Sequence, residues 1–186
     1  MKKFLKTNGL LIGLATLIVF LDQLTKVLVR QNLAIGETWM PWKWLEPYAR
    51  FVHWQNTGAA FGIFQNSNLI FMILSTIVSI VMVIYFQKVR PEETLTRIAF
   101  SMQFGGALGN LVDRFKFGHV TDFVSVGTFP VFNIADACVT VGVSLLVLSI
   151  LIQERKEMRL KATTKQTEQA ELQTTAMDTN DEHKIN

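Results

Sequence analysis

The chain has 186 residues, of which 49% are hydrophobic and only 18% are charged. The formal net charge is +3 at pH 7, but the Lys and Arg residues lie beside hydrophobic runs and form no stripe interleaved with aromatic residues, so nucleic-acid binding has no support. Because the charges gather in loops and termini, the composition is typical of an integral membrane protein and excludes a soluble domain with an evenly charged surface.

The first two hydrophobic segments, residues 9–29 and 69–86, predict transmembrane helices, because about 20 helical residues cross the hydrocarbon core of a bilayer. The first contains Asp22 and Lys26, which are four residues apart and suited to an intrahelical ion pair. A signal peptide is the alternative for this segment, but no small-x-small cleavage site follows Leu21, so we favour a retained helix. The second segment has no charged residue and is the clearest span.

The third and fourth segments are residues 97–113 and 134–152. The third is less apolar, but Gly105 and Gly109 are spaced for close contact between helices, which favours a span buried among the others. The fourth is apolar except for Asp136 near its start. The sequence therefore predicts an all-α membrane protein with four transmembrane helices.

The distribution of basic residues predicts the orientation of these helices. Basic residues are frequent before the first helix, between the second and third, and after the fourth, which places these three segments in the cytoplasm. They are Lys2, Lys3, Lys6, Lys88, Arg90, Arg97, Arg155, Lys156, Arg159, Lys161 and Lys165. Both termini are thus expected to be cytoplasmic.

The first outer loop carries all four tryptophans, whose amphipathic rings favour the lipid headgroup region. Residues 49–54 alternate as a short strand would, and Asn56-Thr57-Gly58 is typical of a turn, so we expect a small extracytoplasmic β-element. At the other end, residues 161–186 are polar and lack a hydrophobic pattern, which predicts a disordered cytoplasmic tail after a membrane domain of residues 1–160.

Polar residues converge on the outer ends of the predicted helices. Ionisable residues in a span cost about 2.5–3.5 kcal/mol each, so they are usually functional or paired. The residues at this depth are Asp22, Asn110, Asp113, Arg114 and Asp136, with Asp122 in the short loop between the last two helices. They predict one site at the outer membrane surface, although structural roles remain open: interhelical polar contacts for the third-helix residues, and helix capping for Asn133 and Asp136.

Other chemistries have less support. Cys138 is the obvious rival nucleophile, but two residues of helix rotate it about 200° away from Asp136, and the histidines lie in loops or the tail. No HExxH spacing, GxSxG motif, P-loop or dinucleotide fingerprint occurs, so we expect neither a metal nor a cofactor.

Five blocks in order resemble the lipoprotein signal peptidases, or signal peptidase II, the aspartic peptidases of the bacterial cytoplasmic (inner) membrane. The blocks are Asp22-Gln23-Leu24-Thr25-Lys26, Asn56-Thr57-Gly58-Ala59-Ala60-Phe61-Gly62, Gly105-Gly106-Ala107-Leu108-Gly109-Asn110-Leu111-Val112-Asp113-Arg114, Val120-Thr121-Asp122-Phe123 and Phe132-Asn133-Ile134-Ala135-Asp136. The resemblance covers about residues 5–155 and implies removal of signal peptides from diacylglyceryl-modified prolipoproteins, with cleavage just before the lipidated cysteine. It also implies contact with membrane phospholipid, and we expect a monomer.

The resemblance also implies residue roles. Asp122 and Asp136 correspond to the catalytic pair. The residues that correspond to supporting or substrate-binding positions are Asp22, Lys26, Asn56, Gly58, Asn110, Asp113, Arg114 and Asn133. Two neighbouring carboxylates can share one proton, which suits hydrolysis of a peptide bond. Asp113 remains open as an alternative partner of Asp136, and a proton-coupled transporter is the alternative function, although such proteins usually show inverted repeats.

Overall fold

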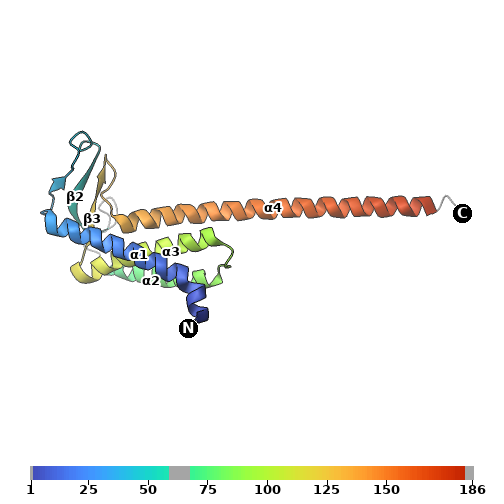
Figure 1. The fold of residues 1–186 in the computed structure, drawn as a ribbon, viewed down its shortest axis with the longest axis horizontal. Helices are drawn as coiled ribbons and strands as arrows, with labels where there is room; N and C mark the ends of the chain where they lie inside the picture. The colour runs from blue at the N-terminus through green and yellow to red at the C-terminus, as the bar shows by residue number, and fades with distance from the viewer. Residues whose placement is uncertain (1, 59–67, 183–186) are drawn as a thin grey trace. The chain divides into compact units, whose positions relative to one another are not determined.

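The computed structural model describes residues 2–58 and 68–182 and is mostly helical (Figure 1). In chain order its elements are α1 (Lys2–Asn32), β1 (Thr38–Trp39), β2 (Ala49–Asn56), α2 (Asn68–Lys88), α3 (Thr94–Phe117), β3 (Val120–Val126) and α4 (Ile134–Glu182). Residues 59–62 of the second block lie outside the described residues. The chain divides after Leu146 into two compact units, and the first contains every residue of the predicted site.

Helix α3 packs against both α1 and α2 (Figure 1). Its glycines permit these close approaches, because a Cβ atom at Gly105 would lie 2.9 Å from Ala15 Cα in α1. At Gly106 the added atom would lie 2.5 Å from Ala135 O at the start of α4. Gly109 borders the carboxylate of Asp22, so the predicted contact through Gly105 and Gly109 is confirmed, and both glycines face α1.

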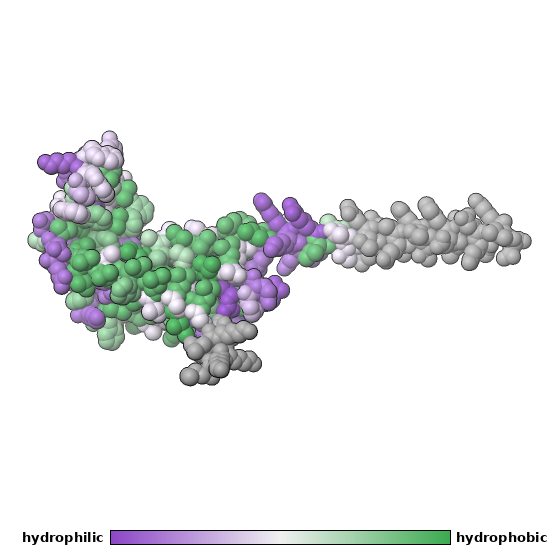
Figure 2. Space-filling model, viewed as in Figure 1, coloured by the Kyte–Doolittle hydropathy of each residue, from purple (hydrophilic) through white to green (hydrophobic). Residues whose placement is uncertain are grey.

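Among the described residues, three helical segments are long and apolar enough to cross a membrane: Asn8–Asn32, Asn68–Lys88 and Ile134–Thr164. Their outward side chains are largely apolar and exposed, and Figure 2 shows a broad hydrophobic surface over the helices. Helix α3 is different, since it buries polar groups such as Ser101, Gln103 and Asn110.

An apolar core and a polar cluster occupy different levels of the first unit. Leu11 of α1, Phe86 of α2 and Phe100 of α3 form the buried apolar cluster. Asp22 lies eleven residues after Leu11 on α1, which corresponds to about 16 Å along the helix axis. The polar residues are thereby separated from this cluster and gathered near the sheet.

The β-element is a three-stranded antiparallel sheet in the order β1-β2-β3. Strand β2 confirms the predicted strand at residues 49–54, and it pairs Trp54 with Asp122 of β3. The expectation that Asp122 lies in a short loop is wrong, because Val120–Val126 form a strand that is buried over most of its length. Burial on both faces allows a polar residue in mid-strand, and Asp122 is only 1% exposed.

Helix α4 continues to Glu182, so the structure has helix where the sequence predicts a disordered tail. The physical basis is local composition, since residues 143–182 contain neither Gly nor Pro and are rich in Ala, Glu, Gln and Lys, which favour helix. Side chains are described only up to Thr164.

Candidate active site

Asp122 and Asp136 come from two elements, β3 and the first turn of α4, and both accept hydrogen bonds from Asn133. Asp122 accepts hydrogen bonds from Asn56 Nδ2 at 2.9 Å and from Asn133 Nδ2 at 2.6 Å. Asp136 accepts from Asn110 Nδ2 at 2.7 Å and from the backbone N–H of Asn133 at 3.2 Å. Each carboxylate is therefore held by amide donors, which leave its charge state free to change.

Asn133 and Asp136 form a reciprocal cap at the start of α4. The backbone N–H of Asp136 donates to Asn133 Oδ1 at 2.9 Å, while Asn133 N–H donates to Asp136 Oδ2. This arrangement satisfies two backbone donors at once, as in a capping box. Capping by Asn133 and Asp136, considered from the sequence as an alternative to a functional role, is confirmed, and it coexists with contact between Asn133 and Asp122.

Asn110 and Asn133 link the two carboxylates through one chain of hydrogen bonds. Asn133 Nδ2 also donates to Asn110 Oδ1 at 3.1 Å, and Asn110 uses its own Nδ2 to reach Asp136. A change in charge at either aspartate therefore acts on the same pair of amides.

The turn after β2 orients Asn56 toward Asp122. The backbone N–H of Gly58 donates to Asn56 Oδ1 at 3.0 Å, which confirms the predicted turn. With its oxygen engaged in this way, the Asn56 amide presents Nδ2 to Asp122. Gly58 thus contributes through its backbone and also borders the cavity described below.

Burial, and after it the negative charge of Asp136, raise the pKa of Asp122 from 3.8 to about 7. Hydrogen bonds from Asn56 and Asn133 and the positive charge of Lys26 act in the opposite sense. The protonated form of Asp122 is therefore well populated near neutral pH, so the pair can hold one shared proton.

Lys26 lies at the centre of a second, fully buried cluster. Its Nζ atom is 2.8 Å from Asp22 Oδ2, which confirms the predicted intrahelical pair, and 3.5 Å from Asp113 Oδ2. It also donates to Asn110 Oδ1 at 2.9 Å. All three charged side chains are 0% exposed, so the pairing is sheltered from water and salt.

Asp113, the alternative partner of Asp136, faces this cationic cluster. Arg30 Nη1 lies 3.5 Å from Asp113 Oδ1, and Gln23 Nε2 donates to the same oxygen at 3.0 Å. Sequence reasoning missed Gln23 and Arg30 as members of the site. Gln23 lies inside the first block, and Arg30 follows Lys26 by one helical turn, so both could have been found from helical spacing.

A cavity of about 690 Å³ opens beside Asp136. Its polar wall includes Asn56, Asn110 and Arg114, and the Arg114 guanidinium lies 5.3 Å from the Phe71 ring centre. The rest of the lining comes mainly from apolar faces of α2, α3 and α4: Phe71, Leu74, Val78, Ala107, Val139 and Val141. Between Arg114 and Gln103 the cavity follows α3 for about 16 Å, the rise of eleven helical residues.

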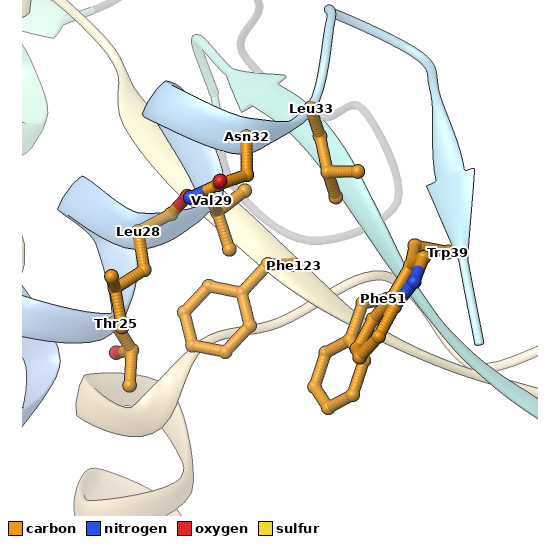
Figure 3. Close-up of a pocket in the computed structure, with 8 residues that line it drawn as sticks. All are labelled: Thr25, Leu28, Val29, Asn32, Leu33, Trp39, Phe51 and Phe123. Atoms are coloured by element: carbon orange, nitrogen blue, oxygen red, sulfur yellow. The ribbon is translucent and has the colours of Figure 1, made fainter. Parts of the chain in front are cut away.

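A second cavity, of about 620 Å³, lies between the end of α1 and the sheet (Figure 3). Phe123 points toward α1, while Trp39 and Phe51 stack on the opposite side with ring centres 5.9 Å apart. Phe123 faces this cavity, and successive side chains of a strand point to opposite faces, so Asp122 lies on the other face of β3. None of the residues lining it is ionisable, so we assign it no chemistry.

The thiol and the two imidazoles of the described residues make none of the hydrogen bonds that surround Asp122 and Asp136. Cys138 is a half-buried free thiol on α4. His53 Nδ1 lies 2.9 Å from Leu33 O, and burial lowers the pKa of His119. Within the described ranges, no group of three or more His, Cys, Asp and Glu side chains could hold a metal ion.

Comparison with known proteins agrees with the resemblance in the sequence. Residues 14–152 match the model of the family described as Signal peptidase (SPase) II. The lipoprotein signal peptidase of Shouchella clausii is 41% identical over 146 residues, covering 78% of this chain and 95% of that protein. For the lipoprotein signal peptidase of Staphylococcus aureus, the values are 32% identity over 166 residues, 86% of this chain and 99% of that protein.

Two solved structures, each described as a bacterial membrane enzyme, have a similar fold. The first superposes with a TM-score of 0.73 at 33% identity, over 78% of this chain and 90% of that one. The second gives 0.69 at 33% identity, over 77% and 93%.

Proposed function

The chain belongs to the signal peptidase II family of membrane aspartic peptidases, which remove signal peptides from prolipoproteins, and we propose that Asp122 and Asp136 are its catalytic pair. The observation that carries this proposal is the shared hydrogen-bond chain through Asn110 and Asn133, which joins the two carboxylates beside a largely apolar cavity of about 690 Å³. The transporter alternative has no support from the comparisons and is not retained.

In the proposed reaction, Asp122 is the protonated member and Asp136 the ionised one. The N-terminus of α4 favours a negative charge on Asp136, and burial keeps the proton on Asp122. Asp136 takes a proton from a water molecule, whose oxygen attacks the scissile carbonyl carbon, while Asp122 donates its proton to the carbonyl oxygen. The intermediate then collapses: the C–N bond breaks, the amine nitrogen receives the proton from Asp136, and a hydroxyl proton returns to Asp122.

The surrounding polar residues orient this pair. Asn56 and Asn133 hold the two oxygens of Asp122, and Asn110 holds Asp136. Arg114 borders the cavity on the same side and supplies a positive charge that can balance negative charge developing on the carbonyl oxygen. These residues supply orientation and electrostatic stabilisation while the carboxylates move protons.

The apolar cavity accounts for the choice of substrate. A diacylglyceryl group carries long hydrocarbon chains, and burying them against Phe71, Leu74 and Val139 releases about 25 cal/mol per Å² of apolar surface. With the lipid held there, the peptide bond just before the modified cysteine reaches Asp136 at the polar end. Recognition then depends on the lipid, and the peptide sequence contributes less.

We also propose that α3 is a fourth span, enclosed by the three apolar helices, in a membrane domain of residues 1–160 that functions as a monomer in contact with phospholipid. Its polar residues are buried against α1, α2 and the site, so the bilayer meets mainly the other helices. Basic residues gather before the first helix, between the second and third, and after the fourth, which supports cytoplasmic termini. The four tryptophans support a site at the outer face of the bacterial cytoplasmic membrane.

The function is tested by incubating purified protein with a lipidated prolipoprotein and measuring release of the signal peptide. Asp122→Asn and Asp136→Asn should each lower the rate at least about 100-fold, because an amide cannot transfer the proton. Cys138→Ala serves as the control and should cleave at the normal rate. Substantial turnover by either well-folded Asn variant would remove the dyad assignment.

The orientation is tested in the Cys138→Ala background with single cysteines introduced as Lys43→Cys, Arg90→Cys and Lys161→Cys. An impermeant thiol reagent should label position 43 in intact spheroplasts. Positions 90 and 161 should react only after the membrane is opened. The reverse order would place the site on the cytoplasmic side.

A further inference from the structure

Two buried carboxylates outside the proposed dyad hold the backbone next to each member of it. Asp22 Oδ1 accepts the N–H of Ala135 at 3.0 Å, and Ala135 directly precedes Asp136. Asp113 Oδ2 accepts the N–H of Thr121 at 2.9 Å, and Thr121 directly precedes Asp122. The start of α4 and strand β3 are thus held by equivalent contacts.

Lys26 contacts both of these carboxylates. Its ammonium group has three N–H donors, and the structure gives it three acceptors: Asp22, Asp113 and the side-chain oxygen of Asn110. The three charged side chains are fully buried, so none can exchange its partner for water. One cation from α1 therefore connects the backbone positions that carry both aspartates.

We propose that Lys26 is a positioning residue for peptide hydrolysis, which sets the separation of the Asp122 and Asp136 carboxylates by holding Asp22 and Asp113 together. The proposal rests on the dyad assigned above and goes beyond it, since the contacts of Lys26 are to Asp22, Asp113 and Asn110 and to neither catalytic carboxylate. Without Lys26, the Asp22 and Asp113 carboxylates lose the cation that both contact, so the segments held at Ala135 and Thr121 are no longer fixed relative to one another.

The surrounding atoms leave Asp22 little freedom to adjust. A Cβ atom at Gly109 would already lie 2.8 Å from Asp22 Oδ2, so this side of the carboxylate is enclosed by the α3 backbone. Movement of Asp22 is therefore transmitted to Ala135 and α4, because the carboxylate cannot rotate into empty space.

Lys26 also sets the direction of the Asn110 amide. An ammonium group only donates hydrogen bonds, so Asn110 must turn its oxygen toward Lys26 and its Nδ2 toward Asp136. An uncharged residue at position 26 removes this constraint, and the amide can then turn its oxygen toward Asp136, where it would repel the carboxylate.

The test compares wild-type protein with Lys26→Met, which keeps an unbranched side chain of similar length and removes the charge. A displacement of reacting groups by about 1 Å can cost about 100-fold, so we expect kcat per folded molecule to fall by about that factor. KM should change less than about twofold, because Lys26, Asp22 and Asp113 do not line the substrate cavity. Amide hydrogen exchange at Thr121 and Ala135 should become faster.

A charge-balanced variant, Lys26→Met with Asp22→Asn, keeps the experiment decisive if Lys26→Met does not fold. It leaves Asp113 paired with Arg30. Its kcat should fall by the same factor as that of Lys26→Met, so the effects of the two substitutions should not be additive. The matched control is Asn8→Ala, which removes a buried side chain that contacts Gln87 at the other end of α1. It should lower thermal stability and leave kcat and amide exchange at Thr121 unchanged.

The proposal is overturned if a folded variant lacking the Lys26 charge keeps its kcat, or if its loss appears only in KM. Failure of the dyad itself has a different signature, since Asp122→Asn and Asp136→Asn would then remain active. If those two variants lose activity while the Lys26 variants keep theirs, the dyad stands and only the positioning role is removed.

Discussion

Asn133 and Asp136 bond each other twice at the start of α4, with Asp136 N–H 2.9 Å from Asn133 Oδ1 and Asn133 N–H 3.2 Å from Asp136 Oδ2. These two contacts engage the Asn133 oxygen and backbone. They leave its Nδ2 group to reach Asp122 at 2.6 Å. One side chain thus caps the helix that carries one aspartate and donates to the other, so stability and activity should be separable at this position.

Asn133→Ser should separate them, because serine is a good helix cap but cannot extend an amide donor to Asp122. A hydrogen bond to a charged group contributes about 1.5–3 kcal/mol, so we expect cleavage to slow by about 10- to 100-fold with little change in melting temperature. Asn133→Ala should lose activity to a similar extent and also about 1 kcal/mol of stability from the missing cap. A serine variant with full cleavage rate would show that the contact with Asp122 is dispensable.

The pKa of Asp122 predicts the alkaline limit of activity. Burial first, and then the charge of Asp136, raise this pKa from 3.8 to about 7. The proton-donating form is present below that pH and is lost as the pH rises through it, so kcat/KM should fall on the alkaline side near pH 7.

Asn56→Ala should move this limit to higher pH, because it removes a hydrogen bond that lowers the pKa of Asp122. Asn32→Ala is the control, since Asn32 donates to Leu28 O on its own helix and should leave the profile in place. The measurement is kcat/KM against pH for the three proteins. An alkaline limit that does not move in Asn56→Ala would assign it to another group.

Hydropathy, helical spacing and the alternation of side chains were sufficient to predict the apolar helices, the pairing of Asp22 with Lys26 and the strand at residues 49–54. These features depend on local order in the chain. The burial of β3 depends instead on β2 covering it, which no pattern within Val120–Val126 reveals. The short segment that contains Asp122 lies between two predicted helices and therefore resembled a loop.

The contacts at the backbone of Thr121 and Ala135 could not be predicted for a related reason. The sequence shows carboxylates at residues 22 and 113, but a backbone N–H has no sequence signature, so the acceptor could be found only from the tertiary structure. Gly106 is similar, since its contact with α4 depends on where that helix begins.

Gly106 has no side chain that could take part in the reaction, but Gly106→Ala should still disturb the site. The added Cβ would lie 2.5 Å from Ala135 O and 2.7 Å from Val139 Cγ2, so α3 and α4 must move apart. Overpacking of this kind typically costs about 1–3 kcal/mol, and we expect lower thermal stability together with slower cleavage. Gly13→Ala is the matched control, because nothing lies within 4 Å of its added atom and it should be at least as stable as wild type. Normal stability of Gly106→Ala would contradict the close packing of α3 against α4.

The last prediction concerns the end of α4. The family match stops at residue 152, and 78% of this chain is enough to cover 95% of the Shouchella clausii relative. Truncation after Lys165 should therefore leave the cleavage rate per folded molecule unchanged in detergent. Replacing Arg155, Lys156, Arg159 and Lys161 with glutamine should have a different effect, because each basic residue near anionic headgroups contributes about 1 kcal/mol to membrane attachment. That variant should show lower membrane yield or altered protease accessibility of the C-terminus before any change in rate. A large fall in rate from the truncation alone, with normal insertion, would show that the residues beyond Lys165 take part in the reaction.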